Sequence, residues 1–256
     1  MVSSHFPKLA AEALDLQNTA LFLDVDGTLL DIAATPESVV VPDGLAETIG
    51  RLEQALGGAL AIVTGRELAD LDRLFFPLRT RAAGVHGAEM RYDPTRPASA
   101  APDSAKLSAD LWREFVSLAG AFPGVAMEDK FYSFTAHYRA APEAAPALRA
   151  ALLRLVEAHR DLDLQLLDGR CAFEIKPSSF DKGEAVRRFL ERPPFVGRRP
   201  IFIGDDVSDE YGFRYVSGQS GVAFAVGAPR KDADDVFADP ATVRRWLERL
   251  AEPAAA

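Results

Sequence analysis

Short apolar runs that end in polar residues recur along this chain of 256 residues. Three of them, residues 20–23, 59–63 and 201–203, consist of apolar side chains without interruption. Runs this short and continuous are typical of strands that are buried on both faces. A fourth run, residues 222–226, lies between glycines. The pattern predicts a sheet in which several strands lead directly into polar clusters.

Leucine and isoleucine at three- and four-residue spacing predict helices between these strands. The expected helices cover residues 43–56, 67–75, 182–190 and 241–250. Strands that alternate with helices imply a doubly wound, Rossmann-like α/β fold, with helices on both faces of a parallel sheet. In such sheets ligands bind beyond the carboxyl ends of the strands, so we expect the polar clusters to gather at one edge.

The middle of the chain has a different pattern. Residues 94–105 are rich in Pro, Ala and Ser, which favours a linker. Beyond it, Asp168-Gly169 favours a tight turn that joins two strands in a hairpin. The expected helices of this region are 106–120 and 143–159, and the expected strands are 125–127, 131–138, 162–167 and 172–175. We therefore expect a core domain of residues 1–99 and 178–256, and an inserted α+β domain of residues 100–177.

The formal net charge of −9 argues against non-specific binding to nucleic acid, which requires a basic surface. It leaves open an anionic substrate, because a site can be locally positive on an acidic protein. The single cysteine, Cys171, fits a reducing compartment. No apolar run is long enough to span a bilayer, and residues 1–16 carry no secretory pattern. We expect a cytoplasmic monomer without a nucleic-acid or membrane partner.

The segment Asp24-Val25-Asp26-Gly27-Thr28-Leu29 places two carboxylates just beyond the first apolar run. A simple turn is one explanation, because Asp and Gly are common turn residues. A turn does not explain the second carboxylate or the threonine. We therefore interpret the segment as a pair of functional carboxylates at the sheet edge.

Residues 204–210 form a second acidic cluster, with four acids in six residues from Asp205 to Glu210. A solvated acidic loop is the simpler explanation, and such loops are common. Together with the Asp24 segment, however, the cluster indicates a site for a hard cation. Oxygen ligands of this kind suit Mg²⁺.

Two further positions follow predicted strands or begin predicted helices. Thr64 could cap a helix or bind an anion, and the two roles are compatible because helix starts favour anions. Lys182 would be an ordinary surface lysine in another context. Next to carboxylates that must approach a phosphate, it would supply compensating positive charge.

In this order, and with a large insert between the second and third, the four segments resemble the motifs of the haloacid dehalogenase superfamily of phosphohydrolases. The resemblance implies that Asp24 attacks phosphorus to form an aspartyl-phosphate. It implies that Asp26 protonates the leaving group and later activates water. Thr64 would bind the phosphoryl group, and Lys182 would offset its charge.

The same resemblance implies a Mg²⁺ cofactor. The side chains of Asp24 and Asp205 and the backbone carbonyl of Asp26 would be its protein ligands. Asp206 and Asp209 would orient this loop without binding the ion directly.

Further segments resemble trehalose-6-phosphate phosphatases. They are Leu23 to Leu30 continuing to Thr35-Pro36, Val63 to Arg66, Gly84 to Glu89, Met127 to Lys130, Ala136 to Arg139, Phe173 to Pro177, and Gly204 to Glu210, in which Ser208 replaces a frequent threonine. This resemblance implies hydrolysis of trehalose 6-phosphate to trehalose and phosphate, in trehalose biosynthesis. The inserted domain would act as a cap that selects the substrate.

Carboxylates and lysines suit sugar hydroxyls, which both donate and accept hydrogen bonds. Glu128, Lys130 and Glu174 of the inserted domain, together with Arg66 and His86 of the core, are therefore the expected substrate-binding residues. For Glu174 a water-facing strand position is an alternative, and for His86 a structural hydrogen bond.

Three other functions stay open from the sequence. The substrate could be another sugar or polyol phosphate. The chain could be a regulatory domain that keeps the fold, because fold alone does not give function. It could also transfer the phosphoryl group to a second sugar, as a mutase does.

Overall fold

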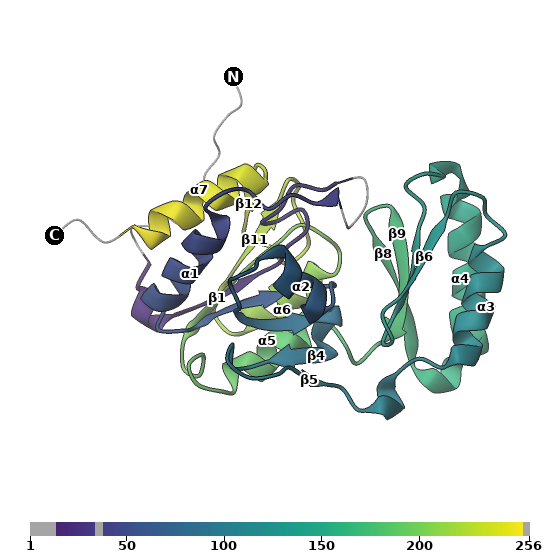
Figure 1. Cartoon of the computed structure of the whole chain (residues 1–256), viewed down its shortest axis with the longest axis horizontal. Helices are drawn as coiled ribbons and strands as arrows, with labels where there is room; N and C mark the ends of the chain where they lie inside the picture. The colour runs from purple at the N-terminus through teal and green to yellow at the C-terminus, as the bar shows by residue number, and fades with distance from the viewer. Residues whose placement is uncertain (1–13, 34–37, 253–256) are drawn as a thin grey trace, which may run out of the picture. The chain divides into compact units, whose positions relative to one another are not determined.

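The computed structural model describes residues 14–33 and 38–252. Thr35-Pro36, part of one of the resembling segments, lies outside the described residues. The chain divides into two compact units. One comprises Met1–Ser99 and Asp181–Ala256, and the other is Ala100–Phe180 (Figure 1). In the part of the chain that the structure describes, no helix is long and apolar enough to cross a membrane.

The first unit is built on an eight-stranded sheet with the order β12-β11-β10-β1-β2-β3-β4-β5. The strands are β1 Thr19–Leu23, β2 Leu60–Val63, β3 Arg81–Gly84, β4 Glu89–Arg91, β5 Ser99–Ala100 at the unit boundary, β10 Arg199–Gly204, β11 Val222–Val226 and β12 Asp235–Phe237. The central strand β1 pairs in parallel with both β10 and β2, whereas β3 and β4 form an antiparallel pair.

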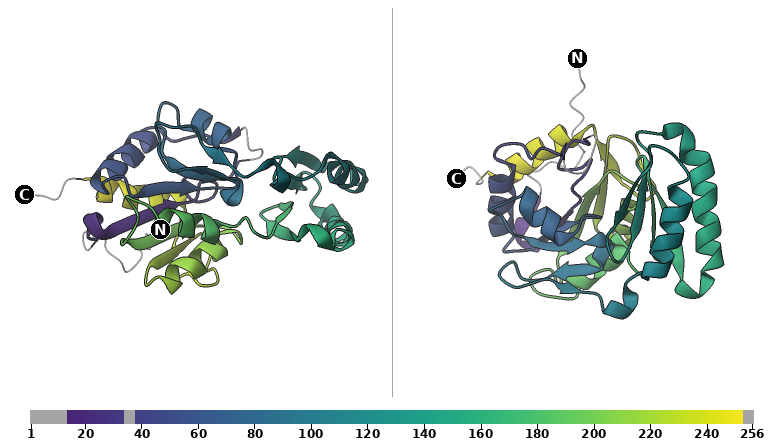
Figure 2. Two further views of the ribbon diagram at one scale, coloured as in Figure 1. Left: turned by 90° about the horizontal axis from the view of Figure 1, so that it is seen from below. Right: turned by 45° about the vertical axis from the view of Figure 1, so that its right-hand side comes forward.

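The chain leaves β1 toward β2 on one side, and later runs from β10 toward β11 on the other. Because parallel crossovers are right-handed, the helices that connect β1, β2 and β3 must lie on the opposite face of the sheet from the helix that connects β10 to β11. The helices are α1 Leu45–Ala55, α2 Leu68–Leu74, α5 Lys182–Leu190, α6 Asp209–Gly218 and α7 Pro240–Ala251. α1 packs against α7, and α5 packs against α6 (Figures 1 and 2). Strand order therefore reverses at β1, and ligands bind at such a point.

All residues of β1 and β2 are buried, as the uninterrupted apolar runs predict. The rings of Phe22, Phe189 and Phe195 pack together beside β1, with centroid separations of 5.1 to 6.1 Å. This core fixes the end of β1, and hence the position of the residues that follow it.

The second unit has a four-stranded antiparallel sheet with the order β6-β7-β9-β8, covered by two helices on one face. Its elements are α3 Ala109–Ala119, β6 Ala126–Asp129, β7 Phe134–His137, α4 Ala145–Ala158, β8 Leu164–Gly169 and β9 Ala172–Pro177. It has its own apolar core, in which Phe115 of α3 and Leu148 of α4 pack with Phe134 and Ile175 of the sheet. The expected α/β fold with an α+β insert is thus confirmed.

The hairpin of β8 and β9 confirms one expectation and corrects another. Asp168 pairs with Phe173 and Gly169 with Ala172, so both belong to β8 and the turn is Arg170-Cys171. The prediction that Asp168-Gly169 forms the turn was wrong. The apolar register overrides local turn preference, because a slip of one residue would turn the helix-facing side chains of the strand to the opposite face.

Candidate active site

Asp24 directly follows β1 and is 4% exposed. Its N–H donates to the carbonyl of Ile203 on β10 over 3.0 Å, so the strand pairing fixes its backbone. The Val25 carbonyl then accepts the N–H groups of Leu29 and Leu30, each over 2.9 Å, which closes a tight loop. The loop directs Asp24 inward and leaves the side chain of Asp26 38% exposed.

Gly27 makes this loop fit against the next acidic segment. Its φ of +80° is a left-handed conformation that glycine adopts without steric cost. A Cβ atom at Gly27 would lie 2.1 Å from Oδ2 of Asp205. The absence of a side chain at Gly27 therefore lets the carboxylate of Asp205, which follows β10, approach the Asp24 loop.

Lys182 joins the two acidic segments. Its Nζ donates to Oδ1 of Asp24 over 2.7 Å and to Oδ1 of Asp209 over 2.6 Å. The exposed fractions of these three side chains are 3%, 6% and 0%. Burial alone would lower the pKa of Lys182, but the charges of Asp209 and Asp24 raise it above its ordinary value. Lys182 therefore remains a cation in the buried site.

Asp209 uses both carboxylate oxygens within the protein. Oδ1 accepts from Lys182, and Oδ2 accepts the N–H groups of Asp205 and Asp206 over 3.0 and 2.9 Å. A Cβ at Gly204 would lie 2.2 Å from Cγ of Asp209, so this loop also requires a glycine. Asp209 thus orders the loop that presents Asp205.

Asp24, Asp205 and Asp209 each offer a carboxylate oxygen, and these oxygens all lie within 4.8 Å of one another. Burial, followed by the negative charge of Asp209, raises the pKa of Asp24 to about 7. Burial and the charge of Asp24 raise the pKa of Asp205 to about 8. Three carboxylates facing a single lysine leave negative charge uncompensated, so this set of donors fits a hard cation. This bears out the coarser expectation that the acidic residues can hold a metal.

Thr64 and Arg66 lie beyond the end of β2. The N–H of Thr64 donates to the Ala83 carbonyl of β3 over 2.9 Å, and its hydroxyl accepts the N–H of Arg66 over 3.1 Å. The Arg66 side chain reaches Asp26: Nε donates to Oδ2 over 2.6 Å and the NH2 nitrogen to Oδ1 over 2.7 Å. The Thr64 hydroxyl thus orders the turn before α2 and does not cap the helix, whose N-cap is Glu67, and the side-chain contacts bring Arg66 to the first carboxylate pair.

His86 lies against the same segment and is 4% exposed. Its N–H donates to the Thr64 carbonyl over 3.1 Å. A Cβ on Gly65 would lie 3.0 Å from the His86 ring. The φ of +55° at His86 is uncommon for a residue with a side chain, and such strain is found at functional sites.

The three expected substrate residues of the second unit lie together on its sheet. Thr135 of β7 pairs with Glu128 on one side and Glu174 on the other, so all three side chains lie on the same face. Lys130 Nζ lies 3.6 Å from Glu128 Oε2. The opposite face carries the apolar core of the unit. The unit therefore carries a polar sheet face with two carboxylates and an amine.

His137 is a member of this face to which the sequence assigned no role. Its Nε2 lies 2.9 Å from Oε2 of Glu128, within hydrogen-bonding distance. Burial alone would raise the pKa of Glu128, but His137 and the charge of Lys130 bring it below its ordinary value. A signal was available in the sequence, because Glu128 and His137 lie in two of the segments quoted for the resemblance.

Arg230 and Asp70 were also missed. Arg230 Nε donates to the backbone carbonyl of Asp205 over 2.8 Å, and Asp70 accepts from the Arg66 guanidinium. Arg230 gives no local signal, because it lies beyond β11 in an irregular segment. Asp70 stands four residues after Arg66, which is the spacing of ion pairs on a helix surface.

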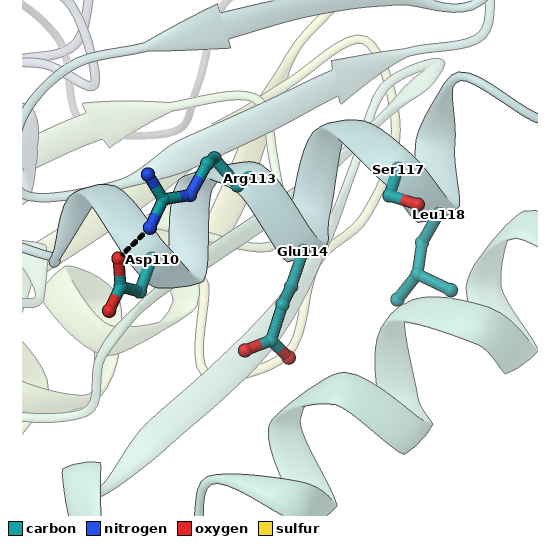
Figure 3. Close-up of a pocket in the computed structure, with 5 residues that line it drawn as sticks. All are labelled: Asp110, Arg113, Glu114, Ser117 and Leu118. Atoms are coloured by element: carbon teal, nitrogen blue, oxygen red, sulfur yellow. Dashed lines mark hydrogen bonds and ion pairs between the residues drawn. The ribbon is translucent and has the colours of Figure 1, made fainter.

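A surface depression of about 570 Å³ lies elsewhere, on α3. Asp110, Arg113, Glu114, Ser117 and Leu118 line it along a single helix (Figure 3). Arg113 pairs with Asp110 there. The depression brings together side chains of one helix only, whereas the Asp24 cluster draws charged groups from three separate segments, so we place the chemistry at the latter.

Comparison with known proteins gives concordant results. A family model described as trehalose-phosphatase matches residues 22–239. A probable trehalose-phosphate phosphatase of Sinorhizobium fredii is 45% identical over 222 residues, which are 86% of this chain and 82% of that protein. The trehalose-6-phosphate phosphatase of Escherichia coli is 37% identical over 232 residues, covering 90% of this chain and 86% of the relative.

Among solved structures, the C-terminal domain of the Candida albicans trehalose-6-phosphate phosphatase superposes with a TM-score of 0.80. The superposition covers 92% of each chain at 22% sequence identity. At that identity the likeness concerns the fold. The family model spans both acidic segments, the Lys182 segment and the whole of the second unit.

Proposed function

This chain belongs to the trehalose-phosphatase family and is a trehalose-6-phosphate phosphatase, and from this premise we propose that it acts through a phospho-aspartate on Asp24. The family expected from the sequence motifs is confirmed. The observation that carries the mechanism is the buried contact of Lys182 with both Asp24 and Asp209 at the carboxyl end of β1. It joins a nucleophile, a fixed positive charge and an acidic loop in one place.

In the first step, a carboxylate oxygen of Asp24 attacks phosphorus and the bond from phosphorus to the sugar oxygen breaks. Asp26, in its protonated form, gives a proton to that leaving oxygen. Covalent catalysis of this kind divides one difficult displacement into two easier ones. Lys182 and Thr64 would bind the phosphoryl oxygens, and Lys182 would offset the repulsion between the phosphate and the carboxylate.

In the second step, Asp26, now a carboxylate, takes a proton from water. The water oxygen attacks phosphorus, and the bond to Asp24 breaks. Inorganic phosphate leaves, while Asp24 and Asp26 return to their starting forms. A positioned acid and base of this kind contributes roughly 10²–10⁴-fold to rate.

We assign Mg²⁺ to the carboxylates of Asp24 and Asp205 and the backbone carbonyl of Asp26. Asp209 is left out of this assignment, because about three of its roughly four acceptor sites already hold Lys182 and the N–H groups of Asp205 and Asp206. When bound, the ion would supply positive charge for the transferring phosphoryl group. Asp206 and Asp209 would hold the loop in shape.

For the sugar, we propose recognition by Glu128, Lys130 and Glu174, with His86 contributing from the first unit. The support is chemical: the polar sheet face of the second unit offers carboxylate acceptors and an ammonium donor for hydroxyl groups. Within the first unit, His86 is held beside Thr64. A monomeric state also stays a prediction, and sedimentation velocity would measure it.

The deciding measurement is release of inorganic phosphate from trehalose 6-phosphate, glucose 6-phosphate and sucrose 6-phosphate, each with Mg²⁺ and with EDTA. We expect strong preference for trehalose 6-phosphate that depends on Mg²⁺. Preference for another ester would overturn the sugar assignment and leave the phosphoryl chemistry. Appearance of a rearranged sugar phosphate would indicate a mutase, and no turnover of any ester would indicate a regulatory domain.

A further inference from the structure

Arg66 makes a bidentate contact with Asp26, the residue proposed as general acid and base. The two nitrogens Nε and NH2 each donate to a different oxygen of the same carboxylate, over 2.6 and 2.7 Å. Both residues belong to the first unit and stand 40 positions apart in the sequence. A planar guanidinium that meets a carboxylate in this way fixes the plane of the carboxylate as well as its distance.

Arg66 is itself held in place. Its N–H donates to the Thr64 hydroxyl, and its carbonyl accepts the N–H of Val85 over 3.0 Å. At the other end of the side chain, NH1 donates to Asp70, which lies four residues further along the chain in α2. The Arg66 side chain is only 9% exposed. Its guanidinium is thus fixed by the protein before it contacts Asp26.

The contact leaves Asp26 able to handle a proton. A carboxylate has about four acceptor sites, and the two hydrogen bonds from Arg66 use two of them. Asp26 is the more open partner, with 38% of its side chain exposed. An oxygen of Asp26 can therefore meet a leaving group or a water molecule while the guanidinium keeps its orientation.

We propose that Arg66 is a positioning residue that aims the carboxylate of Asp26 at the leaving oxygen and later at the attacking water. This inference rests on the proposed function, because it assumes that Asp26 gives and takes that proton. It assigns Arg66 to the chemical step, whereas the sequence analysis expected it to bind the substrate. A displacement of about 1 Å in a reacting group lowers a rate by about 10²-fold, which sets the expected size of the effect.

The test compares two phosphate esters that differ in their need for an acid. Trehalose 6-phosphate must leave as a sugar alcohol, so its departure needs the proton of Asp26. p-Nitrophenyl phosphate releases a stable phenolate and needs no proton. Rapid-quench single turnovers would measure formation of the phospho-aspartate from each ester, and steady-state assays would measure kcat and KM.

For Arg66→Lys we expect formation of the phospho-aspartate from trehalose 6-phosphate to fall about 10²-fold. Formation of the phospho-aspartate from p-nitrophenyl phosphate should change less than about threefold, because it needs no proton from Asp26. Hydrolysis of that phospho-aspartate should fall as much as its formation from trehalose 6-phosphate, since both of these steps depend on a positioned Asp26. Asp70→Asn leaves the contact between Arg66 and Asp26 in place. In this variant we expect the same Asp26-dependent steps to fall by about tenfold, and formation of the phospho-aspartate from p-nitrophenyl phosphate to be spared.

Arg73→Ala is the matched control. Arg73 contacts the other oxygen of Asp70, but its side chain is 70% exposed and lies one step further from Asp26. Exposed ion pairs contribute little, so its rates should stay within about twofold of the wild type. Guanidinium added at concentrations well below those that unfold the protein should partly restore Arg66→Ala, which a general loss of structure would not allow.

Three results would overturn the inference. A rise in KM for trehalose 6-phosphate at unchanged kcat would make Arg66 a substrate-binding residue. Equal losses with both esters, together with a lower melting temperature, would make it structural. If Arg66→Lys kept the wild-type rates with both esters, Arg66 would have no role in positioning Asp26. If instead the wild type forms no phospho-aspartate from either ester, the proposed function fails before the variants are compared.

Discussion

Oδ1 of Asp24 lies 2.7 Å from the ammonium of Lys182, in a buried cluster with Asp205 and Asp209. Its removal tests the covalent mechanism most directly. Asp24→Asn keeps the size of the side chain but removes the proposed nucleophile, so we expect kcat to fall by about 10³-fold or more. Phosphate release with Mg²⁺ measures the rate, and a thermal melt shows whether the fold persists. A rate close to that of the wild type in a folded variant would contradict the mechanism.

Gly27 provides a second residue-scale prediction, because its missing Cβ leaves room for Asp205. Gly27→Ala should push the Asp205 carboxylate away from Asp24 and lower kcat by about 10²-fold, as small displacements at a reacting centre do. Activity as a function of Mg²⁺ concentration would measure both turnover and apparent metal affinity.

Gly44→Ala is the matched control for this substitution. Gly44 has a similar φ of +78°, but a Cβ there would have no other atom within 4 Å. Both variants should lose about 1–2 kcal/mol of stability from left-handed backbone strain. Only Gly27→Ala should lose activity, and equal loss in both would assign the effect to strain alone.

Sequence patterns identified most of these residues for a physical reason. Asp24, Lys182 and Asp205 directly follow strands or begin helices, so the order of elements carries them to one edge of the sheet. The contact of Arg66 with Asp26 was not predictable in this way. It depends on the rotamer of a long side chain and on Asp70, which no strand end marks.

Among the elements, α5 connects local structure to chemistry, because Lys182 is its first residue. Oδ1 of Asp181 accepts the N–H of Glu184 over 2.8 Å and so caps the helix. Asp181→Ala should cost about 1 kcal/mol of stability and let the first turn fray. Because that turn carries Lys182, we also expect kcat to fall about tenfold, as measured by phosphate release beside urea unfolding.

Two variants separate the contribution of the cap from a general effect on stability. Asp239 caps α7 through the N–H of Thr242 over 2.7 Å, and α7 carries none of the proposed catalytic residues. Asp239→Ala should lose about as much stability but keep kcat. Asp181→Asn, which retains a capping oxygen, should keep both. If Asp239→Ala lowered kcat as much as Asp181→Ala, the position of Lys182 would not be the reason.

Element prediction succeeded where apolar residues were dense and failed where packing demanded small ones. β1, β2, β10 and β11 were found as apolar runs. α6 was not, because it contains Gly212, which is a poor helix former. A Cβ at Gly212 would lie 2.8 Å from the Phe202 ring, so close packing of the helix on the sheet explains the glycine.

At the scale of the whole molecule, the acidic site links stability to pH. Unfolded aspartates titrate near about 3.9, whereas burial and mutual repulsion raise the pKa of Asp24 to about 7 and of Asp205 to about 8. Between these values the folded state binds more protons than the unfolded state. The contribution of these two carboxyl groups to the free energy of unfolding is therefore complete below about pH 4 and is lost as pH rises toward about 8.

Metal removal should expose this dependence. In EDTA, we expect the melting temperature to fall as the pH rises from about 5 to about 8.5, over and above the change seen in saturating Mg²⁺. Calorimetry at several pH values would measure both series. Asp205→Asn, which removes one of the two titrating groups, should reduce the difference. Parallel curves with and without Mg²⁺ would contradict the assignment of the ion to these carboxylates.

The discontinuity of the first unit has a consequence for synthesis on the ribosome. Asp24 and Lys182 are separated by 158 positions, and β1 pairs with β10 only once residues near 199 exist. At a translation rate of roughly 5–20 residues per second, Lys182 is added about 8 to 30 seconds after Asp24. During that interval the inserted unit, which is continuous from Ala100 to Phe180, is translated in full. A nascent chain therefore contains the whole inserted unit just before Lys182 is added, and roughly 1 to 4 seconds before β10 begins at Arg199.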